Sequence, residues 1–537
     1  AGEDLLGGGF VSVLSNQVLS NSDFLTGAFP AEYGNATSAV FDMKLRNGNT
    51  NKMEHAIQVG VLGIDFSSEG PFKMGKKSSY VVNYRYSTFG LMNNFLPDNT
   101  GLPAYQDITF KLNFPNSNGT ISIWGTGGLD AYKYKKLIDD KYKYGVTGIN
   151  LKRILNSTTY INATLAVNTY TKSNRWFTES NSEIYPKSRL ESIDGKYTLS
   201  FLINKKFSNK HQNRTGINAL SMFYTFDNKF SGSPSQPLKQ ISDEKGNSVL
   251  LQLYSQSKYS IDSKLMINPG IHFQYFTLNG KYSYEPRLGI NYAISSKQML
   301  SFAYGKHCQL QQLNLYFSQI QENGNITKPN KNMDFTTAHH FIMGYEYKIN
   351  ENMRFKAEPY IQILRNVPVI ADSSFSILNL EVGNTFNEKL INNGSGQNIG
   401  IDFTLERFLN NNYYFLITTS IFDSKYKGGD GKLRNIRYNK NFMLNFLTGK
   451  EWTLGIKRSN IIGVNGRVYI KSGDRYGNID NQASVQSQQV AFSNDGLFTK
   501  KNPMSGRVDV SITYTINKMG VSHIFALQIL NITGTPI

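Results

Sequence analysis

The sequence is poor in the features that define disulfide-linked, metal-clustered and helical membrane proteins. Of its 537 residues only Cys308 is a cysteine, which excludes an internal disulfide and a metal site made of several cysteines. No run of about 18 apolar residues occurs, so no transmembrane helix is expected. Charged residues are only 18% of the chain, a low share for a soluble globule. An ordinary soluble globule is therefore not the first expectation.

Aromatic residues, by contrast, are abundant. They make up 13% of the chain, with 32 tyrosines and 34 phenylalanines. A transmembrane β-barrel needs this mixture, because one face of each strand presents aliphatic and aromatic side chains to lipid while the other face lines a wet lumen. The composition therefore favours an all-β transmembrane barrel, the architecture of proteins in the outer membrane of Gram-negative bacteria.

Polar and apolar residues alternate along many segments of about ten residues, the length that a tilted strand needs to cross a bilayer. In residues 354–363, Arg354, Lys356 and Glu358 share one face, and the opposite face is apolar. Three charges on one face are favourable only where that face is wet, so the pattern predicts a lumen. The same alternation recurs in residues 161–168, 401–406 and 508–516.

The links between these strands differ in length in a regular way. Short links are expected near 115–118, 155–157, 295–297, 350–352, 410–412 and 517–519. Long links are expected at about 89–104, 127–142, 172–194, 229–247, 306–335, 365–396 and 473–503. A soluble β-sandwich also alternates polar and apolar residues, but it has no reason to segregate loop length. An outer-membrane barrel does, with tight periplasmic turns and long outer loops.

Counting strands in this way gives about 21, whereas single-chain bacterial barrels have even numbers of strands. The last predicted strand, His523 to Asn531, would end at the outer rim. We therefore expect residues 50–537 to form a transmembrane antiparallel β-barrel of about 22 strands, of which about 21 are present and the closing strand is lacking.

One stretch near the N-terminus, residues 27–48, differs from the strands. It begins with small residues and the turn pair Gly34-Asn35, alternates like a strand from Val40, and ends in the turn signal Asn47-Gly48. Such a stretch predicts a tight turn that leads into a short strand.

The segment Phe29-Pro30-Ala31-Glu32-Tyr33-Gly34-Asn35 resembles the closing part of the plug domain in TonB-dependent outer-membrane receptors, most of all those of the Bacteroidota. Ser38-Ala39 stands where many of these relatives have a Gly-Gly pair. Further segments in matching order are similar to the barrel of the same receptors: Glu69-Gly-Pro71, Tyr284-Glu-Pro-Arg287, Gly344-Tyr-Glu346, Glu358-Pro-Tyr360 and Gly449-Lys-Glu-Trp452. The resemblance covers essentially the whole chain.

The resemblance implies that residues 1–49 are the C-terminal remnant of a plug domain and that residues 50–537 are the barrel. Such receptors bind a scarce extracellular ligand on outer loops and plug, and the TonB complex pulls on an N-terminal box to move the plug. The chain shows neither this box nor a signal peptide, so we expect a mature or truncated piece. A partner surface lipoprotein, which accompanies some Bacteroidota receptors, stays open.

The formal net charge is +18. No run of about five or six basic residues indicates nucleic acid, so we attribute the charge to contact with outer-membrane lipid and lipopolysaccharide and to the lumen lining. One outer loop combines cations with an aromatic residue: Lys425, Tyr426, Arg434 and Arg437. These residues could meet an anionic ligand, but a solvated loop with ion pairs and packed aromatics is the stronger alternative.

The sequence has no motif of an enzyme or of a cofactor or metal site. His339 and His340 are adjacent on a strand, so they point to opposite faces and cannot chelate one ion together. His307 is expected to be a satisfied or exposed histidine. We therefore predict a non-enzymatic receptor and transporter. The alternative is a passive porin or surface adhesin without energy coupling, and the sequence does not name the ligand.

Overall fold

The computed structural model describes residues 14–535 except for 62, 74–76, 90–100, 181, 232–233, 235, 323, 381–385, 456–458, 488–491 and 494–495. Most regular structure in this part of the chain is β-strand. No helix of the described residues is long and apolar enough to cross a membrane.

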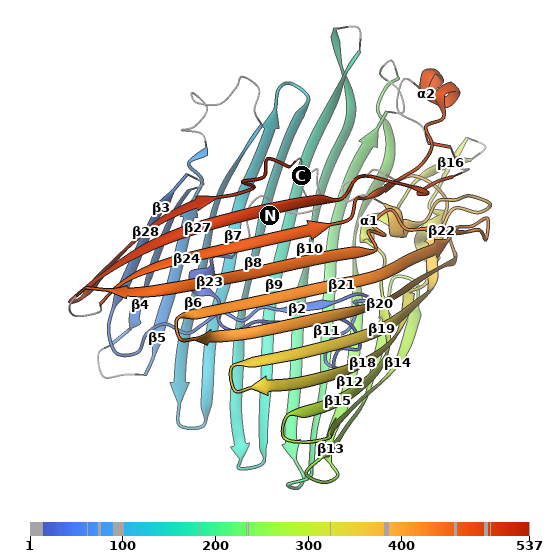
Figure 1. Ribbon diagram of the computed structural model, residues 1–537. Coiled ribbons are helices and arrows are strands. Elements are labelled where there is room, and N and C mark those ends of the chain that lie inside the picture. The colour runs from blue at the N-terminus through green and yellow to red at the C-terminus, as the bar shows by residue number, and fades with distance from the viewer. Residues whose placement is uncertain are drawn as a thin grey trace.

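Within the described residues, 21 long strands form one antiparallel sheet that curls around a central space (Figure 1). They are β3 (Glu54–Gly60), β4 (Gly63–Pro71), β5 (Ser79–Tyr86), β6 (Leu102–Asn116), β7 (Gly119–Tyr134), β8 (Ile138–Asn156), β9 (Thr159–Ser180), β10 (Glu183–Lys206), β11 (His211–Phe230), β12 (Lys239–Ser260), β13 (Leu265–Phe276), β14 (Lys281–Ala293), β15 (Gln298–Gln309), β18 (Thr336–Asn350), β19 (Met353–Val369), β20 (Ile391–Asn410), β21 (Tyr413–Lys427), β23 (Phe442–Leu454), β24 (Asn460–Lys471), β27 (Ser505–Lys518) and β28 (Val521–Ile529). This agrees with the number of strands predicted from the sequence.

The smaller elements lie before the sheet or in its connections. Before it come η1 (Asn16–Val18), β1 (Asp23–Leu25) and β2 (Val40–Asp42). The connections contain α1 (Leu313–Tyr316), β16 (Ile320–Glu322), β17 (Asn325–Thr327), η3 (Pro329–Asn332), η4 (Ile377–Asn379), β22 (Leu433–Asn435), β25 (Arg475–Tyr476), α2 (Asn481–Ser487) and β26 (Lys500–Lys501).

Consecutive long strands pair in sequence order from β3 to β28. The same order places β28 next to β3 around the ring. The described residues of these two strands nevertheless share none of the residue-by-residue pairing that joins the other neighbours, and all nine residues of β28 are exposed. Adjacent strands satisfy each other's backbone N–H and C=O groups only where their residues pair, so β3 and β28 are described as neighbours without an assigned register.

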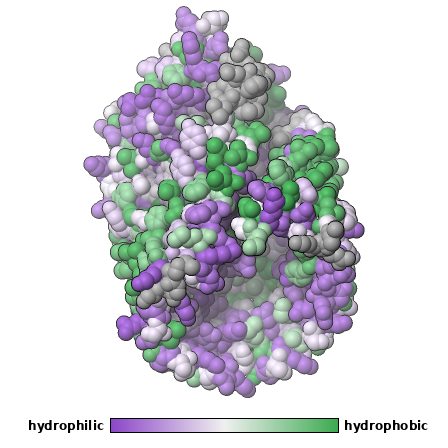
Figure 2. Space-filling model, turned by 90° about the vertical axis from the view of Figure 1, so that its left-hand side faces the viewer, coloured by the Kyte–Doolittle hydropathy of each residue, from purple (hydrophilic) through white to green (hydrophobic). Residues whose placement is uncertain are grey.

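Side chains alternate between the two faces of the sheet, as the sequence predicted. Outward positions on β9 and β10 include Leu165, Tyr197 and Leu199, which are 60%, 57% and 54% exposed. Inward positions include Gln274 and Glu285, which are fully buried and hydrogen-bonded to each other at 2.6 Å. Figure 2 shows the molecule hollowed on one face, with hydrophilic and hydrophobic residues around the opening.

Strand prediction was correct for the four alternating segments, which lie within β9, β19, β20 and β27. The expected long links at 127–142 and 172–194 were wrong. β7 and β8 stay paired up to Tyr134 and Ile138, and β9 and β10 up to Ser180 and Glu183. The hairpin of β9 and β10 projects beyond that of β7 and β8 (Figure 1). The long link expected at 229–247 is shorter than predicted, because β11 ends at Phe230 and β12 begins at Lys239.

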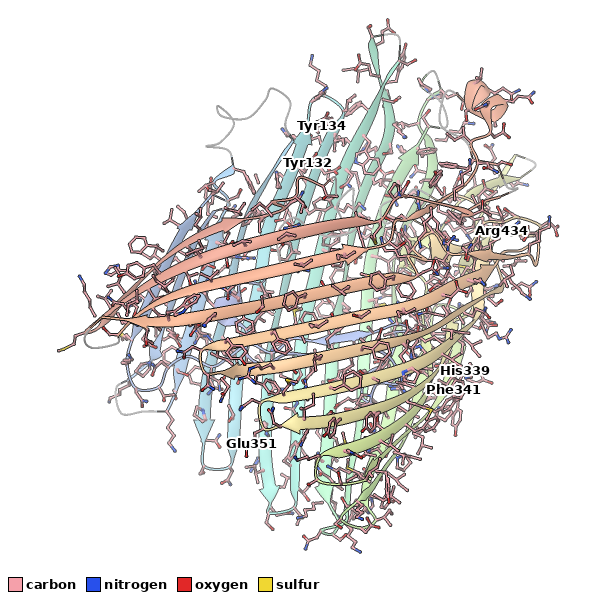
Figure 3. All side chains as sticks on the ribbon, in the orientation of Figure 1. Tyr132, Tyr134, His339, Phe341, Glu351 and Arg434 are labelled. Carbon is pink, nitrogen blue, oxygen red and sulfur yellow. The ribbon has the colours of Figure 1, made fainter. Side chains whose placement is uncertain are left out.

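The two rims of the sheet differ. Glu351 lies in a short turn at one rim, whereas Tyr132, Tyr134 and Arg434 lie at the other, where the long connections gather (Figure 3). The largest buried apolar cluster lies where two of these connections pack onto the ends of β11–β15. It consists of Tyr224, Phe226, Leu250, Phe276, Cys308, Leu310, Leu315, Tyr316, Phe317, Met333, Phe335 and Leu390.

Candidate functional site

The inner wall of the sheet holds a short segment of chain, residues 27–37, which we call the wall-bound segment. It lies between β1 and β2, which pair with each other from Asp23 opposite Asp42 to Leu25 opposite Val40. Figure 1 shows β2 inside the ring of strands. The wall-bound segment is not itself a strand, so the strands around it supply partners for its backbone.

Arg287 of β14 makes the central contact. Its Nη1 donates to the carbonyl oxygens of Phe29 at 3.2 Å and Tyr33 at 2.6 Å, and also to that of Pro30. Its Nη2 donates to Glu285 at 2.9 Å, and both charged residues are almost fully buried. A buried guanidinium is stable only when a carboxylate and further acceptors surround it. The turn at 29–33 is therefore part of what satisfies Arg287.

Two buried histidines bind the backbone of the same segment. Nδ1 of His340 accepts from the Ala28 N–H at 3.1 Å, and its Nε2 lies 2.9 Å from the Thr37 carbonyl oxygen. A carbonyl can only accept, so Nε2 carries the proton and the ring is neutral. Nδ1 of His272 donates to the Ala31 carbonyl at 2.7 Å by the same reasoning.

Phe29 fills an aromatic pocket. The centroid of the Phe29 ring is 4.0 Å from that of the His307 ring. The Arg287 guanidinium carbon lies 5.1 Å from the centroid of the Phe29 ring. His307 is fully buried, and neither of its ring nitrogens has a hydrogen-bond partner among the described residues. The prediction of a satisfied or exposed histidine was wrong, because Phe29 covers the ring. His339 and His340 do lie on opposite faces, as predicted, and His339 meets the Tyr304 hydroxyl at 3.1 Å.

Three further residues predicted for this site, Glu32, Gly34 and Asn35, also face the wall. Glu32 forms an ion pair with Arg214 of β11 at 2.9 Å, and Asn35 Oδ1 accepts from the Leu310 N–H at 2.7 Å. Gly34 leaves no room for a side chain, because a Cβ built there would lie 2.2 Å from Nε2 of His272.

Tyr33 links the wall-bound segment to β2, because its hydroxyl donates to Asp42 at 3.0 Å. Burial raises the pKa of Tyr33, and the nearby carboxylates of Glu32 and Asp42 raise it further. The phenol therefore stays protonated and acts as a donor.

A second set of contacts holds the chain on either side of this segment to β4–β6. Ser15 donates to Asp65 at 2.7 Å, Arg46 pairs with Glu69 at 2.6 Å, and Lys111 donates to the Leu45 carbonyl at 2.8 Å. The described chain before β3 is thus tied to the wall at two places. Among the described residues, no group of three or more His, Cys, Asp or Glu side chains is placed to hold a metal ion.

The predicted loop aromatic, Tyr426, is 1% exposed. Its hydroxyl donates to the Ser374 carbonyl at 2.9 Å, under the connection between β19 and β20. This burial favours the packing alternative over contact with a ligand. Phe317, in another outer loop, is likewise buried.

The predicted loop cations, Lys425, Arg434 and Arg437, lie near the same rim. Lys425 pairs with Asp423 at 2.9 Å, and Arg434 binds Asp430 through two bonds of 2.8 and 2.6 Å. The Arg437 N–H donates to Asn379 at 2.9 Å. These contacts favour the ion-paired alternative, and a role in ligand binding stays a prediction.

Sequence reasoning missed the wall residues that hold the segment. Tyr284-Glu-Pro-Arg287 marked the family resemblance, but it gave no indication that Arg287 would bind the turn at 29–33. The available signal was a glutamate and an arginine two positions apart, on one face of a strand. A charged pair on an inward face needs partners, yet the sequence does not say that a backbone turn provides them.

Residues 31–532 match the family model described as TonB dependent receptor-like, beta-barrel. The fold is similar to that of the siderophore receptor PiuA from Acinetobacter baumannii, with a TM-score of 0.70, 12% identity, and coverage of 96% of this chain and 82% of that one.

Two further solved structures are similar to the same extent. The outer membrane transporter YddB from Escherichia coli has a TM-score of 0.70 at 11% identity, over 97% of this chain and 81% of that one. The ferric preacinetobactin receptor BauA from A. baumannii has a TM-score of 0.67 at 11% identity, over 97% and 82%. At such low identity the likeness is one of fold. No curated protein sequence matches the chain.

Proposed function

Because the chain belongs to the family of TonB-dependent receptor β-barrels, we propose that it binds a scarce extracellular ligand and imports it through TonB-driven movement of a plug. Members of this family are outer-membrane receptors and transporters. In this proposal residues 1–49 are the C-terminal part of the plug and residues 50–537 are the barrel. TonB acts through an N-terminal box outside these residues.

The attachment of the wall-bound segment inside the sheet carries this proposal. A passive porin keeps its lumen filled with water, whereas this lumen holds chain that is bound through Arg287, His272 and His340. All of these contacts are noncovalent, so the segment can be held in one state and released in another. A plug that gates a pathway needs both properties.

We also propose that one more strand closes the barrel between β28 and β3, giving 22 strands. Every residue of β28 and nearly every residue of β3 is exposed, although both strands carry apolar side chains such as Val59 and Ile524. Unpaired strand edges in lipid leave backbone groups without partners, which a membrane barrel does not tolerate. An inserted strand would satisfy both edges.

The ligand class is a separate question. Siderophore, cobalamin, oligosaccharide and peptide all suit a receptor of this fold, and a Bacteroidota origin with a surface lipoprotein stays a further proposal. Some similar structures are siderophore receptors, which makes iron starvation the first growth condition to test. Higher transcript abundance without iron would support a siderophore or haem ligand. Induction by a glycan or peptide, with no response to iron, would point to nutrient import and a partner lipoprotein.

The test of energy coupling is uptake in the native host. We expect ligand uptake to stop when the N-terminal box of the full protein is deleted or when the proton gradient is collapsed, while ligand binding at the cell surface persists. Uptake that survives both treatments would reject the proposal and support a passive porin. Surface binding without any uptake in untreated cells would support an adhesin.

A further inference from the structure

The outward face of β6–β9 contains a shallow groove of about 300 Å³. Gly127 of β7 and Gly145 of β8 form its floor, because these residues pair directly and neither has a side chain. Ile108 and Val167 border it on either side. A Cβ built on Gly145 would meet no atom within 4 Å, so the space above that residue is open.

The groove faces lipid and not the lumen. Ile149 and Leu165, which lie on the same face of β8 and β9, are 48% and 60% exposed. The opposite face is the lumen side, where the hydroxyls of Thr109 and Thr126 bond at 2.8 Å and Thr109 is buried. Alternation along each strand therefore assigns Gly127 and Gly145 to the membrane side.

Two other glycines on this face are covered, which makes the open space at Gly145 unusual. A Cβ on Gly125 would lie 2.9 Å from the ring of Phe110, and one on Gly195 would lie 2.4 Å from the ring of Phe223. Aromatic rings thus fill the space above these two glycines. No side chain of the described residues fills the space above Gly145.

Cations follow the groove along the same face towards the outer rim. Lys143 and Lys141 are the next two outward positions on β8 after Gly145, about 7 and 13 Å along the strand. Lys133 of β7 and Arg175 of β9 complete what we call the basic belt, and all four side chains are exposed. Paired residues across β7–β9 keep them on one face.

The basic belt is incompletely neutralised. Lys141 lies 3.7 Å from Asp139, and Arg175 lies 3.6 Å from Glu191, so both pairs are loose. Neither Lys133 nor Lys143 makes an ion pair with any residue that the structure describes. The belt therefore keeps positive charge directly above an apolar groove.

We propose that the groove and the basic belt together bind an anionic, phosphate-bearing lipid of the outer leaflet. An acyl chain lies against Gly127 and Gly145, and the phosphate meets Lys141 and Lys143. The order along β8, first an apolar groove and then cations towards the outer rim, matches the order of acyl chain and headgroup in a lipid. An acyl chain packed on the open surface at Gly145 gains van der Waals contacts, and the headgroup phosphate neutralises Lys143 and the loosely paired Lys141. The proposal requires only the outer-membrane location and does not depend on transport.

The test is lipid retention by the whole protein. Protein reconstituted in phosphatidylcholine nanodiscs with a small fraction of lipid A is released into the gas phase, and native mass spectrometry counts the lipid A that stays bound. The double substitution K141E/K143E should lower retention at least about tenfold, because each of the two lost cations contributes roughly fivefold to attraction towards an anionic lipid surface. The substitution Gly145→Trp fills the groove and should lower retention severalfold.

Two matched controls locate the effect. Lys205→Glu reverses an exposed, outward lysine near the short turn at the other end of β10, and Gly145→Ala adds a single methyl group in open space. Both should retain lipid A within about twofold of the wild type. Far-UV circular dichroism checks that each variant is folded, and Gly145→Leu replaces the tryptophan variant if that one is not.

The outcomes separate the explanations. Retention by K141E/K143E equal to that by Lys205→Glu would overturn the proposal, as would equal retention of lipid A from which both phosphates have been removed. Equal retention of phosphatidylglycerol and lipid A would support a phosphate site that does not distinguish the two headgroups. A preference for lipid A would assign the site to lipopolysaccharide.

Discussion

The two faces of the same sheet carry binding surfaces of opposite kinds. On the lumen face, Arg287, His272 and His340 are buried and hydrogen-bond to the backbone of the wall-bound segment. On the lipid face, Lys143 is exposed and unpaired among the described residues, and Gly145 has open space above it. The lumen surface is occupied by the wall-bound segment, whereas the surface on the lipid face has no bound segment of this chain among the described residues.

This difference follows from the alternation of strand residues. Neighbouring positions on one strand face different solvents, so a strand can bury a charged anchor at one position and present a groove at the next. A buried charge must find its partner within the chain, since leaving it unpaired is costly. An exposed lysine near a lipid surface needs none, because anionic headgroups neutralise it.

The largest effect is expected from Arg287→Met, which removes the charge but keeps much of the volume. Glu285 would then be buried without its partner, and the carbonyls at 29–33 would lose their donor. We expect a loss of about 3–5 kcal/mol in the free energy of unfolding and proteolysis within residues 27–37. The double substitution with Glu285→Gln should recover part of this loss. A single variant as stable as the wild type would show that the pair does not anchor the segment.

A smaller effect is expected from Gly34→Ala. The added methyl group would lie 2.2 Å from Nε2 of His272, so either the turn or the histidine must move. We expect about 1–3 kcal/mol of destabilisation, measured by denaturant unfolding. Gly145→Ala is the matched control, since its methyl group meets nothing within 4 Å. Equal stability of the two variants would contradict the close contact at Gly34.

His340→Ala should remove one acceptor and one donor from the backbone at Ala28 and Thr37. The expected cost is about 1–3 kcal/mol, because two buried backbone groups lose their partners. His340→Gln can supply an acceptor and a donor and should cost less. Hydrogen exchange at Ala28 reports the change, and equal exchange in both variants would argue against the bonding role of this side chain.

The smallest effect is expected in the outer loop. The Arg434 side chain, through its hydrogen bonds, holds the pKa of Asp430 below its usual range. A carboxyl whose folded pKa is depressed contributes stability above its ordinary pKa and loses that contribution as pH falls through the depressed value. Arg434→Gln should raise this pKa and remove the contribution, at a cost below about 1 kcal/mol. Loop proteolysis compared at pH 7 and at about pH 2, below the depressed pKa, measures the loss, and an unchanged pH profile would exclude the pairing.

Sequence alone predicted the part of the fold that depends on the bilayer. Residues 354–363 alternate because one face meets lipid and the other meets water, so their strand was identifiable. The outer end of the hairpin at Tyr134 and Ile138 was not identified from the sequence, because this hairpin continues beyond the bilayer, where the outward face is no longer apolar. A strand with water or headgroups on both sides lacks the pattern by which the others were recognised.

The candidate site was predictable on one side only. Phe29 to Asn35 were identified by resemblance, and the structure places them on the lumen wall. The wall residues that hold them come from strands that are far away in sequence, and no local pattern connects Arg287 with the carbonyl of Tyr33. The same limit applies to Gly145, whose open surroundings depend on side chains of three other strands.

The central claim is that residues 27–37 are bound to the lumen wall as part of a plug. Hydrogen exchange of the full protein in nanodiscs, without ligand, tests it most directly. The account predicts that the amides of Ala28 and Ala31, which donate to His340 and Gln256, exchange as slowly as those of β13 and β14. Exchange as fast as in an unfolded peptide, with the strands still protected, would contradict it.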